Sequence, residues 1–373
     1  MQPEPFALER YFARHEFSAR YLLSSSDCEA LGLNELLAFA DENTRDLWDG
    51  LRLGYTESSG HPRLREAIAE LYLGLADDDV LVLAPEEGIY LLMHALLRPG
   101  DHVVTTFPGY QSLYSLAEAI GCRVARWQPD EAAGWRFDLG DLTALLEPQT
   151  RLVVINFPHN PTGATLSEAD FRALVALLQA RGITLLSDEM YRYLEYMPAS
   201  TLPAACALYD RAVSLGGLSK SFGLPGLRIG WLASRDQELL RRIQQLKDYT
   251  TICSSAPSEI LALIALQNRQ NILETQKKRA SGNRARLVDF MNSYQHVFTW
   301  QPQAGSSVCF PRMKTVTDTL AFSDRCVQET GIMLVPSRMF HYGDRHLRIG
   351  FGRANFPQGL VAFGKYLDQL FDG

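Results

Sequence analysis

A single lysine, Lys220, stands between two serines in the stretch SLGGLSKSFGLPGLRIGW, residues 214–231. An arginine, Arg228, follows eight positions later, after a loop rich in Gly, Leu and Pro. Asp188 ends another apolar run, ITLLSD, where a poorly solvated carboxylate would need a cationic or proton-donating partner. An amine, a carboxylate and a planar guanidinium suited to phosphate are therefore expected close together.

These groups must be positioned by a sheet. Short apolar runs alternate with helix-period segments from about residue 60 to 235, which predicts an α/β fold with a mostly parallel seven-stranded sheet sandwiched by helices. Ligands of such sheets bind beyond the carboxyl ends of the strands. Three of these ends are polar and rich in turns, namely PHNPTG, SDEMY and LSKSF. The predicted strands are residues 80–84, 102–107, 122–127, 152–157, 183–188, 212–217 and 228–234.

The three strand ends offer one consistent set of chemical groups. Asp188 supplies an acid, Lys220 an amine and Arg228 a phosphate binder, while Asn160 and Tyr191 add neutral donors. Pyridoxal 5′-phosphate (PLP) needs an acid partner for its ring nitrogen, a lysine for its aldehyde and donors for its phosphate. The residues therefore predict a PLP site.

The chain changes character after residue 270. A long basic helical stretch is followed by short strands in SSVCFPRM, IMLVPS and HLRIGFG and by a last helix. This pattern predicts a smaller α/β domain. We expect an N-terminal segment over 1–40 that packs with the small domain, a large PLP-binding domain over 41–270 and a small C-terminal domain over 271–373.

The blocks NFPHNPTG, SDEMY, LSKSFGLPGLRIGW and HLRIGFGR occur in this order, with LGYTESSGHPRLREAIAELY before them. Together they resemble the fold-type I PLP enzymes, specifically the class I/II aminotransferases, over nearly the whole chain. The resemblance implies an aminotransferase that transfers the amino group of an L-amino acid to a 2-oxo acid through a Schiff base of Lys220.

The resemblance also implies roles for the residues that touch the cofactor ring. Lys220 resembles the lysine that binds the aldehyde and then shuttles the proton between the substrate Cα and the cofactor. Asp188 resembles the aspartate that keeps the ring nitrogen protonated. Tyr191 and Asn160 match the donors to the phenolic oxygen, and Tyr110 matches the aromatic residue that stacks on the ring.

Other residues match ligands of the phosphate and the substrate. Ser219 and Arg228 match phosphate ligands. Tyr55 matches a tyrosine that reaches the phosphate of the neighbouring subunit, which implies a homodimer with shared active sites. Arg348 matches the arginine that binds the substrate α-carboxylate through both guanidinium nitrogens, beside Asn160.

One block departs from the family pattern. LAPEEGIY, residues 83–90, stands where a small, Gly-rich turn would hold the phosphate through its amides. Pro85 has no N–H group, and Glu86 and Glu87 bring negative charge. A helix that begins after Pro85 would still favour an anion. We therefore expect the amides of Glu86 and Glu87 to bind the phosphate while their carboxylates point away.

Each assignment has a structural alternative. Lys220 would then be a solvated surface lysine, and Asp188 the N-cap of a helix. Asn160 would serve only the turn that Asn-Pro-Thr-Gly forms, and Arg228 and Arg348 would form surface ion pairs. The order of the family-like blocks favours the functional interpretation in every case.

The reaction has an alternative too. The opening YLLSSSDCEALGLNELLAFAD, the EEGIY turn and HYGDRHLRIGFGR resemble the branch that contains capreomycidine synthase, which eliminates a β-hydroxyl from a guanidino amino acid and closes a ring. Four early acidic residues would bind a basic substrate side chain in such an enzyme, or else form a solvated helix face. They are Glu9, Glu16, Asp27 and Glu29.

Composition and charge restrict the classes of partner that the protein can bind. The net charge is −7 and no Lys/Arg-rich run occurs, which argues against nucleic acid, and no apolar run is long enough to span a membrane. The six dispersed cysteines and a first stretch without a signal-peptide core predict a cytoplasmic protein. HYGDRH lacks a third clustered ligand, so we expect no metal. A PLP-binding regulator without activity is disfavoured because Lys220 is present.

Overall fold

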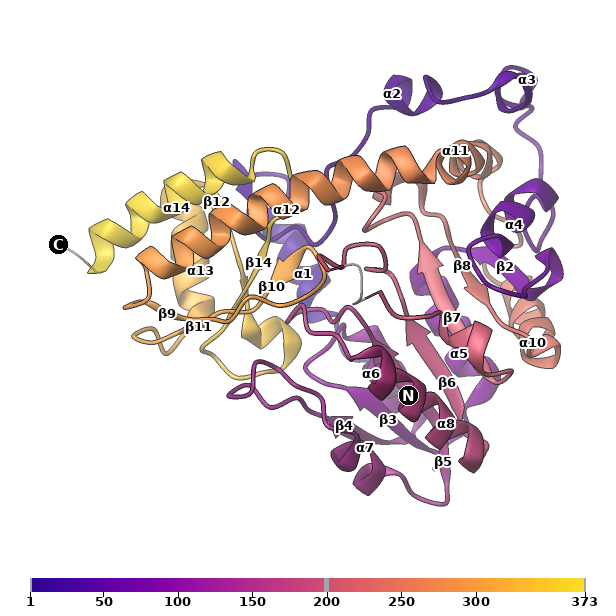
Figure 1. Cartoon of the computed structure of the whole chain (residues 1–373), viewed down its shortest axis with the longest axis horizontal. Coiled ribbons are helices and arrows are strands. Elements are labelled where there is room, and N and C mark those ends of the chain that lie inside the picture. Colours follow the sequence, from indigo (N-terminus) through magenta and orange to yellow (C-terminus); the bar gives the residue numbers. More distant parts are fainter. Residues whose placement is uncertain (1, 198–200, 372–373) are drawn as a thin grey trace.

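The computed structural model describes residues 2–197 and 201–371, and a seven-stranded sheet forms its larger part (Figure 1). The strand order is β2-β8-β7-β6-β5-β3-β4, with β8 antiparallel to both neighbours and every other pair parallel. The predicted mostly parallel seven-stranded sheet is therefore confirmed. The strands are β2 (Val80–Leu83), β3 (His102–Thr106), β4 (Arg123–Trp127), β5 (Thr150–Asn156), β6 (Thr184–Asp188), β7 (Ala212–Gly217) and β8 (Gly230–Ala233).

The inner strands are apolar because both faces of the sheet are covered. Along β5, Val153 packs in one cluster with residues of α8, while Val154 packs in another with residues of α5, α6 and α10. The predicted helix after Ser167 is present: Ser167 accepts a hydrogen bond from the Asp170 amide, and Gly182 ends the helix in a left-handed conformation. The covering helices are α4 (Pro62–Ala69), α5 (Pro85–Leu96), α6 (Ser112–Ile120), α7 (Leu139–Leu145), α8 (Glu168–Arg181), α9 (Ala205–Leu208), α10 (Gln237–Lys247) and α11 (Ala256–Gln267).

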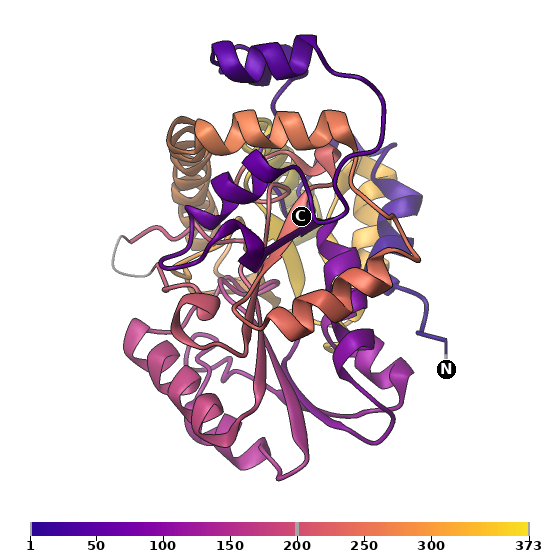
Figure 2. The same cartoon turned by 90° about the vertical axis from the view of Figure 1, so that its right-hand side faces the viewer.

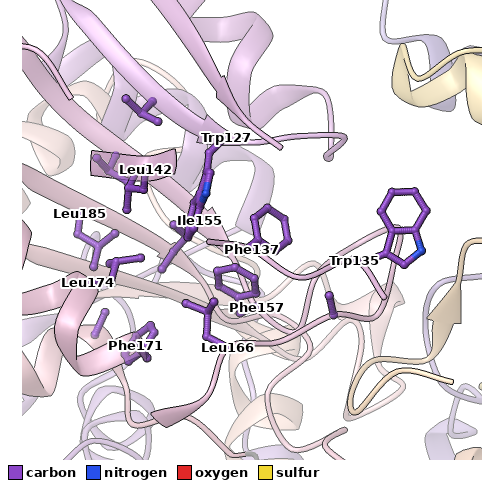
Figure 3. Packing of buried hydrophobic residues seen from close by; sticks show 14 of the residues in the cluster. Trp127, Trp135, Phe137, Leu142, Ile155, Phe157, Leu166, Phe171, Leu174 and Leu185 are labelled. Carbon is purple, nitrogen blue, oxygen red and sulfur yellow. The ribbon is translucent and has the colours of Figure 1, made fainter. Parts of the chain in front are cut away.

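A cluster of aromatic rings packs in the core beside β4 and β5. Figure 3 shows Trp127, Phe137 and Phe157 together, and the Phe137 ring centroid lies 4.9 Å from that of Trp127 and 5.1 Å from that of Phe157. Trp135 lies apart from this group, toward the C-terminal part of the chain, where its ring centroid is 5.8 Å from that of Phe310.

The C-terminal part contains small sheets and three helices. Strand β14 (Leu347–Gly350) pairs antiparallel with β10 (Val308–Cys309) and β13 (Val335–Pro336), and β9 (Phe298–Thr299) pairs with β11 (Arg312–Met313). The long helix α12 (Arg269–Ser293) runs from beside α11 to these sheets (Figure 1). The domain boundaries at residues 40 and 270 stay a prediction. The other elements here are α13 (Thr319–Thr330), η4 (Ser337–Phe340) and α14 (Phe356–Phe371).

The N-terminal segment contacts both parts of the molecule. Strand β1 (Tyr21–Leu22) pairs in parallel with β12 (Ile332–Met333) of the C-terminal part. Helix α1 (Ala7–His15) lies between the small sheets and the large one (Figure 1), with the Ala7 amide 2.8 Å from Gln111 Oε1 and His15 Nε2 3.5 Å from Asp324 Oδ1.

Two further short helices follow the N-terminal segment. Helices α2 (Leu33–Leu37) and α3 (Glu42–Asp49) pack on α11 instead of on the small sheets (Figures 1 and 2). The end of the predicted 1–40 segment therefore sits on a helix of the larger part. Within the described residues, no helix has the length and apolar character needed to cross a membrane. The remaining elements of the described residues include the 3₁₀ turns η1 (Asp77–Asp79) and η3 (Pro225–Leu227).

Candidate active site

A cavity of about 540 Å³ lies beyond the carboxyl ends of β5, β6 and β7. Helix α1, the start of α5 and strand β14 complete its walls. Parallel strands deliver their carboxyl ends to one edge of a sheet, so residues far apart in the chain meet here. Most of the site residues predicted from the sequence line this cavity, namely Glu86, Tyr110, Asn160, Asp188, Tyr191, Ser219, Lys220, Arg228 and Arg348.

Lys220 occupies the loop after β7. Its Nζ donates to the Ser26 hydroxyl at 2.9 Å, and its carbonyl accepts a hydrogen bond from the Cys28 amide at 3.1 Å. The N-terminal segment therefore holds both the backbone and the amine of this lysine. Sequence reasoning did not identify Ser26, because no motif marks it.

Asp188 is the last residue of β6 and is buried. Its Oδ1 accepts from the Met190 amide at 3.1 Å, and its carbonyl accepts from Asn156 Nδ2 at 3.1 Å. Burial raises the pKa of the Asp188 carboxyl to about 7, while the Met190 amide and the charge of Lys220 act in the opposite direction. A protonated ring nitrogen beside it would restore the charged form.

Three hydroxyl groups of the cavity lining have no hydrogen-bond partner among the described residues. They are Ser25 Oγ, Tyr191 Oη and Ser219 Oγ, and all three are buried. A buried hydroxyl without a partner loses its bonds to water, which is unfavourable unless a ligand replaces them. A phenolic oxygen near Tyr191 and a phosphate near Ser219 would do so, which fits PLP.

Arg348 comes from β14 and is only 1% exposed. Its Nη1 donates to Asn160 Oδ1 at 3.2 Å and its Nη2 to the Ser24 carbonyl at 2.8 Å, whereas its Nε is buried without a partner among residues 2–197 and 201–371. Burial lowers the pKa of the guanidinium. A carboxylate in the cavity would compensate this desolvated charge.

The close approach of the N-terminal segment to β14 depends on Gly350. Its amide donates to the Leu23 carbonyl at 2.7 Å, and a Cβ at this position would overlap the Ser25 carbonyl. The missing side chain therefore lets residues 23–25 lie against the strand, which brings the Ser24 carbonyl to Arg348.

The two glutamates at the start of α5 differ in their position relative to the cavity. Glu87 Oε1 accepts from the Thr250 and Thr251 hydroxyls at 2.5 and 2.9 Å, and this residue does not line the cavity. Glu86 does line it, and its Oε2 accepts from Ser112 Oγ at 3.2 Å. A hydroxyl of α6 thus holds the Glu86 carboxylate at the cavity wall. The expectation that this carboxylate points away from a bound phosphate stays a prediction.

Three other predicted residues complete the description. Arg228 adopts a left-handed conformation at φ 55° and donates from Nη1 to the Pro225 carbonyl at 3.1 Å. Tyr110 donates from its hydroxyl to Glu9 Oε1 at 3.2 Å. Tyr55 is 90% exposed and lies outside the cavity of its own chain, so its role toward a neighbouring subunit stays a prediction.

The N-terminal segment contributes a further wall, which includes three of the four acidic residues that the sequence analysis named. Glu9, Glu16 and Asp27 line the cavity, whereas Glu29 does not and its Oε2 accepts from the Ala354 amide at 2.6 Å. The burial of Leu8 and Tyr11 of α1 fixes which face of this helix is inward. The other lining residues of the segment are Phe6, Leu8, Phe12, Ser25 and Ser26.

The acidic wall is only partly neutralised. Asp27 Oδ2 lies 2.8 Å from Arg353 Nη2, in a pair whose side chains are mostly buried. Burial and the nearby charges of Asp27 and Glu9 raise the pKa of the Glu16 carboxyl. This wall would therefore favour a cationic ligand.

With this geometry established, the family is clear. Residues 21–360 match the family model of aminotransferase class I and II, and the chain belongs to this family. It is a PLP-dependent enzyme of the transferase type, as the sequence predicted, and the Asp188, Tyr191, Ser219 and Lys220 side chains fit that cofactor.

Particular relatives share most of the chain. Capreomycidine synthase from Streptomyces vinaceus is 33% identical over 96% of this chain and 93% of its own. The arginine–pyruvate transaminase AruH from Pseudomonas aeruginosa is 29% identical over 79% of this chain and 77% of its own. A crystal structure of a PLP-dependent aminotransferase from Streptococcus suis superposes with a TM-score of 0.92 at 30% identity, covering 99% of both chains.

Proposed function

We propose that this enzyme acts on an L-amino acid with a cationic, guanidino-type side chain. The observation that carries the proposal is that Glu9 and Glu16 of the N-terminal segment line the same cavity as Lys220. Carboxylates next to a reactive lysine favour a substrate that brings its own positive charge.

The cations of the cavity all have other partners in this proposal. Lys220 binds the aldehyde of the cofactor, Arg228 its phosphate and Arg348 the α-carboxylate of the substrate. Arg353 already pairs with Asp27 at 2.8 Å. Glu9 and Glu16 then remain uncompensated, because Glu9 accepts only the neutral Tyr110 hydroxyl among the hydrogen bonds of the described residues. A guanidinium group would compensate them.

The residues of the chain then have defined tasks in the reaction. When bound, PLP acts as an electron sink for the bond broken at the substrate Cα. Asp188 keeps the ring nitrogen protonated, and Tyr191 donates to the phenolic oxygen. Arg348 and Asn160 orient the α-carboxylate. Lys220 would hold the cofactor aldehyde, and its amine would be the base that accepts the proton from the substrate Cα and donates it to the cofactor.

We propose transamination with a 2-oxo acid as the reaction, since Lys220, Asp188 and Arg348 suffice for it. A second candidate is elimination of a β-hydroxyl followed by ring closure. The match to capreomycidine synthase favours it, because that match includes 96% of this chain. Both candidates use a guanidino amino acid.

The test is the visible absorbance spectrum of the purified yellow enzyme during addition of L-arginine, a β-hydroxyarginine or L-norleucine. Loss of the yellow colour with arginine, and its recovery with pyruvate, would establish transamination. A product of the hydroxyarginine that has lost water, without amino transfer, would establish elimination. Equal responses to arginine and norleucine would refute the proposed substrate class.

We also propose a cytoplasmic homodimer with shared active sites. Its support is a set of large apolar side chains exposed in the single chain, among them Leu53, Tyr55, Tyr249 and Ile252. The Tyr55 loop and the loop after α10 are tied together, because Lys247 Nζ donates to the Ser58 carbonyl at 2.6 Å and to the Ile252 carbonyl at 3.2 Å. Light scattering of the holoenzyme tests the assembly.

A further inference from the structure

Glu86 brings a further carboxylate to the cavity. It belongs to the first turn of α5, where the sequence led us to expect backbone contacts to a phosphate. Glu86 lines the cavity, and its carboxylate accepts the Ser112 hydroxyl at 3.2 Å. The lining thus has a carboxylate on α5 in addition to Asp188 and to those of the N-terminal segment.

Tyr110 connects this part of the cavity to the N-terminal wall. The Tyr110 hydroxyl donates to Glu9 at 3.2 Å, and Ser112, two residues further on, donates to Glu86. Burial and then the charges of Glu86 and Glu9 raise the pKa of Tyr110 well above its usual value. Glu86 and Glu9 are therefore both close to this ring.

We propose that Glu86 and Glu9 form a carboxylate pair beside Tyr110 that binds the cationic end of the substrate side chain. Glu86 is then a residue that determines specificity. A guanidinium group is planar and presents donors along several edges, so two carboxylates can bind it at once. This inference rests on the proposed function, because it assumes a cationic substrate.

The charges around Glu86 agree with this role. The pKa of the Glu86 carboxyl is raised to about 7, mainly by burial; the Ser112 hydrogen bond and the charge of Arg228 act against this rise, and the charges of Glu9 and Asp188 add to it. A cation that binds between Glu86 and Glu9 favours their ionised forms. Binding should therefore release a proton near pH 7, and affinity should increase as the pH rises from 6 to 8.

The first experiment measures binding to the holoenzyme by isothermal titration calorimetry. The ligands are 5-guanidinopentanoate, which has no α-amine to react with the cofactor, and hexanoate, which has the same carboxylate but no cationic group at the end of its chain. Glu86→Gln should weaken guanidinopentanoate binding about tenfold or more, as expected for a lost charge-assisted hydrogen bond, and leave hexanoate binding within about twofold. Glu118→Gln is the matched control, because Glu118 lies on α6 outside the cavity, 3.6 Å from Arg126.

The outcomes separate this inference from the proposed function. If the wild type binds guanidinopentanoate no better than hexanoate, the proposed substrate class fails. If the wild type prefers guanidinopentanoate and Glu86→Gln retains that preference, only the role of Glu86 is refuted. A Glu86→Gln protein that loses the preference while it keeps the absorbance spectrum of bound PLP supports the pair.

A second measurement uses the wild type and therefore does not depend on a variant that folds. Titrations of guanidinopentanoate in two buffers of different ionisation enthalpy give the number of protons released at pH 7. Net proton release on binding to the wild type supports the Glu86–Glu9 pair. The number of protons released should be smaller in Glu86→Gln if that variant folds. No release, or uptake, would overturn the proposal.

Discussion

Arg348 donates a hydrogen bond from Nη1 to the side-chain oxygen of Asn160 at 3.2 Å, although 188 positions of sequence separate them. Arg348 belongs to the small sheet at β14, and Asn160 to the loop after β5 of the large sheet. Both side chains are buried, so the bond connects the two sheets at the wall of the cavity. Changes to β14 should therefore affect substrate binding directly.

Gly350→Ala tests that connection. An added Cβ would overlap the Ser25 carbonyl, so either β14 or residues 23–25 must move. Overpacking of this kind costs about 1–3 kcal/mol. We expect a lower melting temperature and an increased KM for the amino acid. Gly54→Ala is the control, because a Cβ at Gly54 has no neighbour within 4 Å among the described residues. Equal melting temperatures for both variants would contradict the prediction.

Lys220→Ala should abolish covalent attachment of the cofactor and leave the fold intact. The cofactor loses its attachment because Lys220 supplies the amine in the loop after β7. The fold is kept because the only hydrogen bond of this side chain among the described contacts is to Ser26. Borohydride reduction followed by mass spectrometry should detect the cofactor on the wild type and not on the variant, while circular dichroism stays unchanged. Turnover of amino acids by Lys220→Ala at the wild-type rate would rule out its assigned role.

Asp188→Asn should stabilise the cofactor-free protein at pH 8 and weaken its binding of PLP. The pKa of this carboxyl is about 7 in the folded chain, against about 4 when unfolded, so the folded state binds more protons between these values. Stability of the wild type should thus fall as the pH rises from 4 to 8, by on the order of 2–4 kcal/mol.

Urea denaturation of the cofactor-free proteins at pH 4.5 and pH 8 measures the effect. The difference in free energy of unfolding between Asp188→Asn and the wild type should be small at pH 4.5 and large at pH 8. A difference that is the same at both pH values would show that the carboxyl is not held in its neutral form.

Glu9→Gln should reduce kcat/KM for L-arginine about tenfold and change that for L-norleucine little, because only the cationic substrate loses a charged partner. Glu29→Gln serves as the control: Glu29 belongs to the same segment but lies outside the cavity and accepts the Ala354 amide. The prediction would fail if both variants lowered the two activities in parallel.

The fold was predictable from the sequence to a large extent. Each of the seven predicted strands is present, with ends that differ by up to two residues. Such buried parallel strands have a clear signal, since both faces must be apolar and the following loops must be polar. The cavity residues Asn160, Asp188 and Lys220 were found for the same reason.

The rest of the site lacked such a signal. Glu9 lies on the short helix α1 and Glu16 directly after it, and the burial of Leu8 and Tyr11 reveals which face of the helix turns inward. The position of the Glu86 carboxylate was not predictable, because it depends on Ser112 of another helix. Contacts between elements remote in the sequence decide both cases, and periodicity does not report them.

Helix α1 is attached to the start of α6 through Ala7 and Gln111 and to α13 through His15 and Asp324, and it carries Glu9 between these two attachments. Lys220 and Asp188, which we propose handle the chemistry, come from entirely different stretches of chain. Part of the proposed substrate choice is therefore encoded apart from the catalytic lysine, and grafting the first thirty residues of a relative onto this chain would exchange Glu9 and its neighbours while Glu86, Asp188 and Lys220 stay in place.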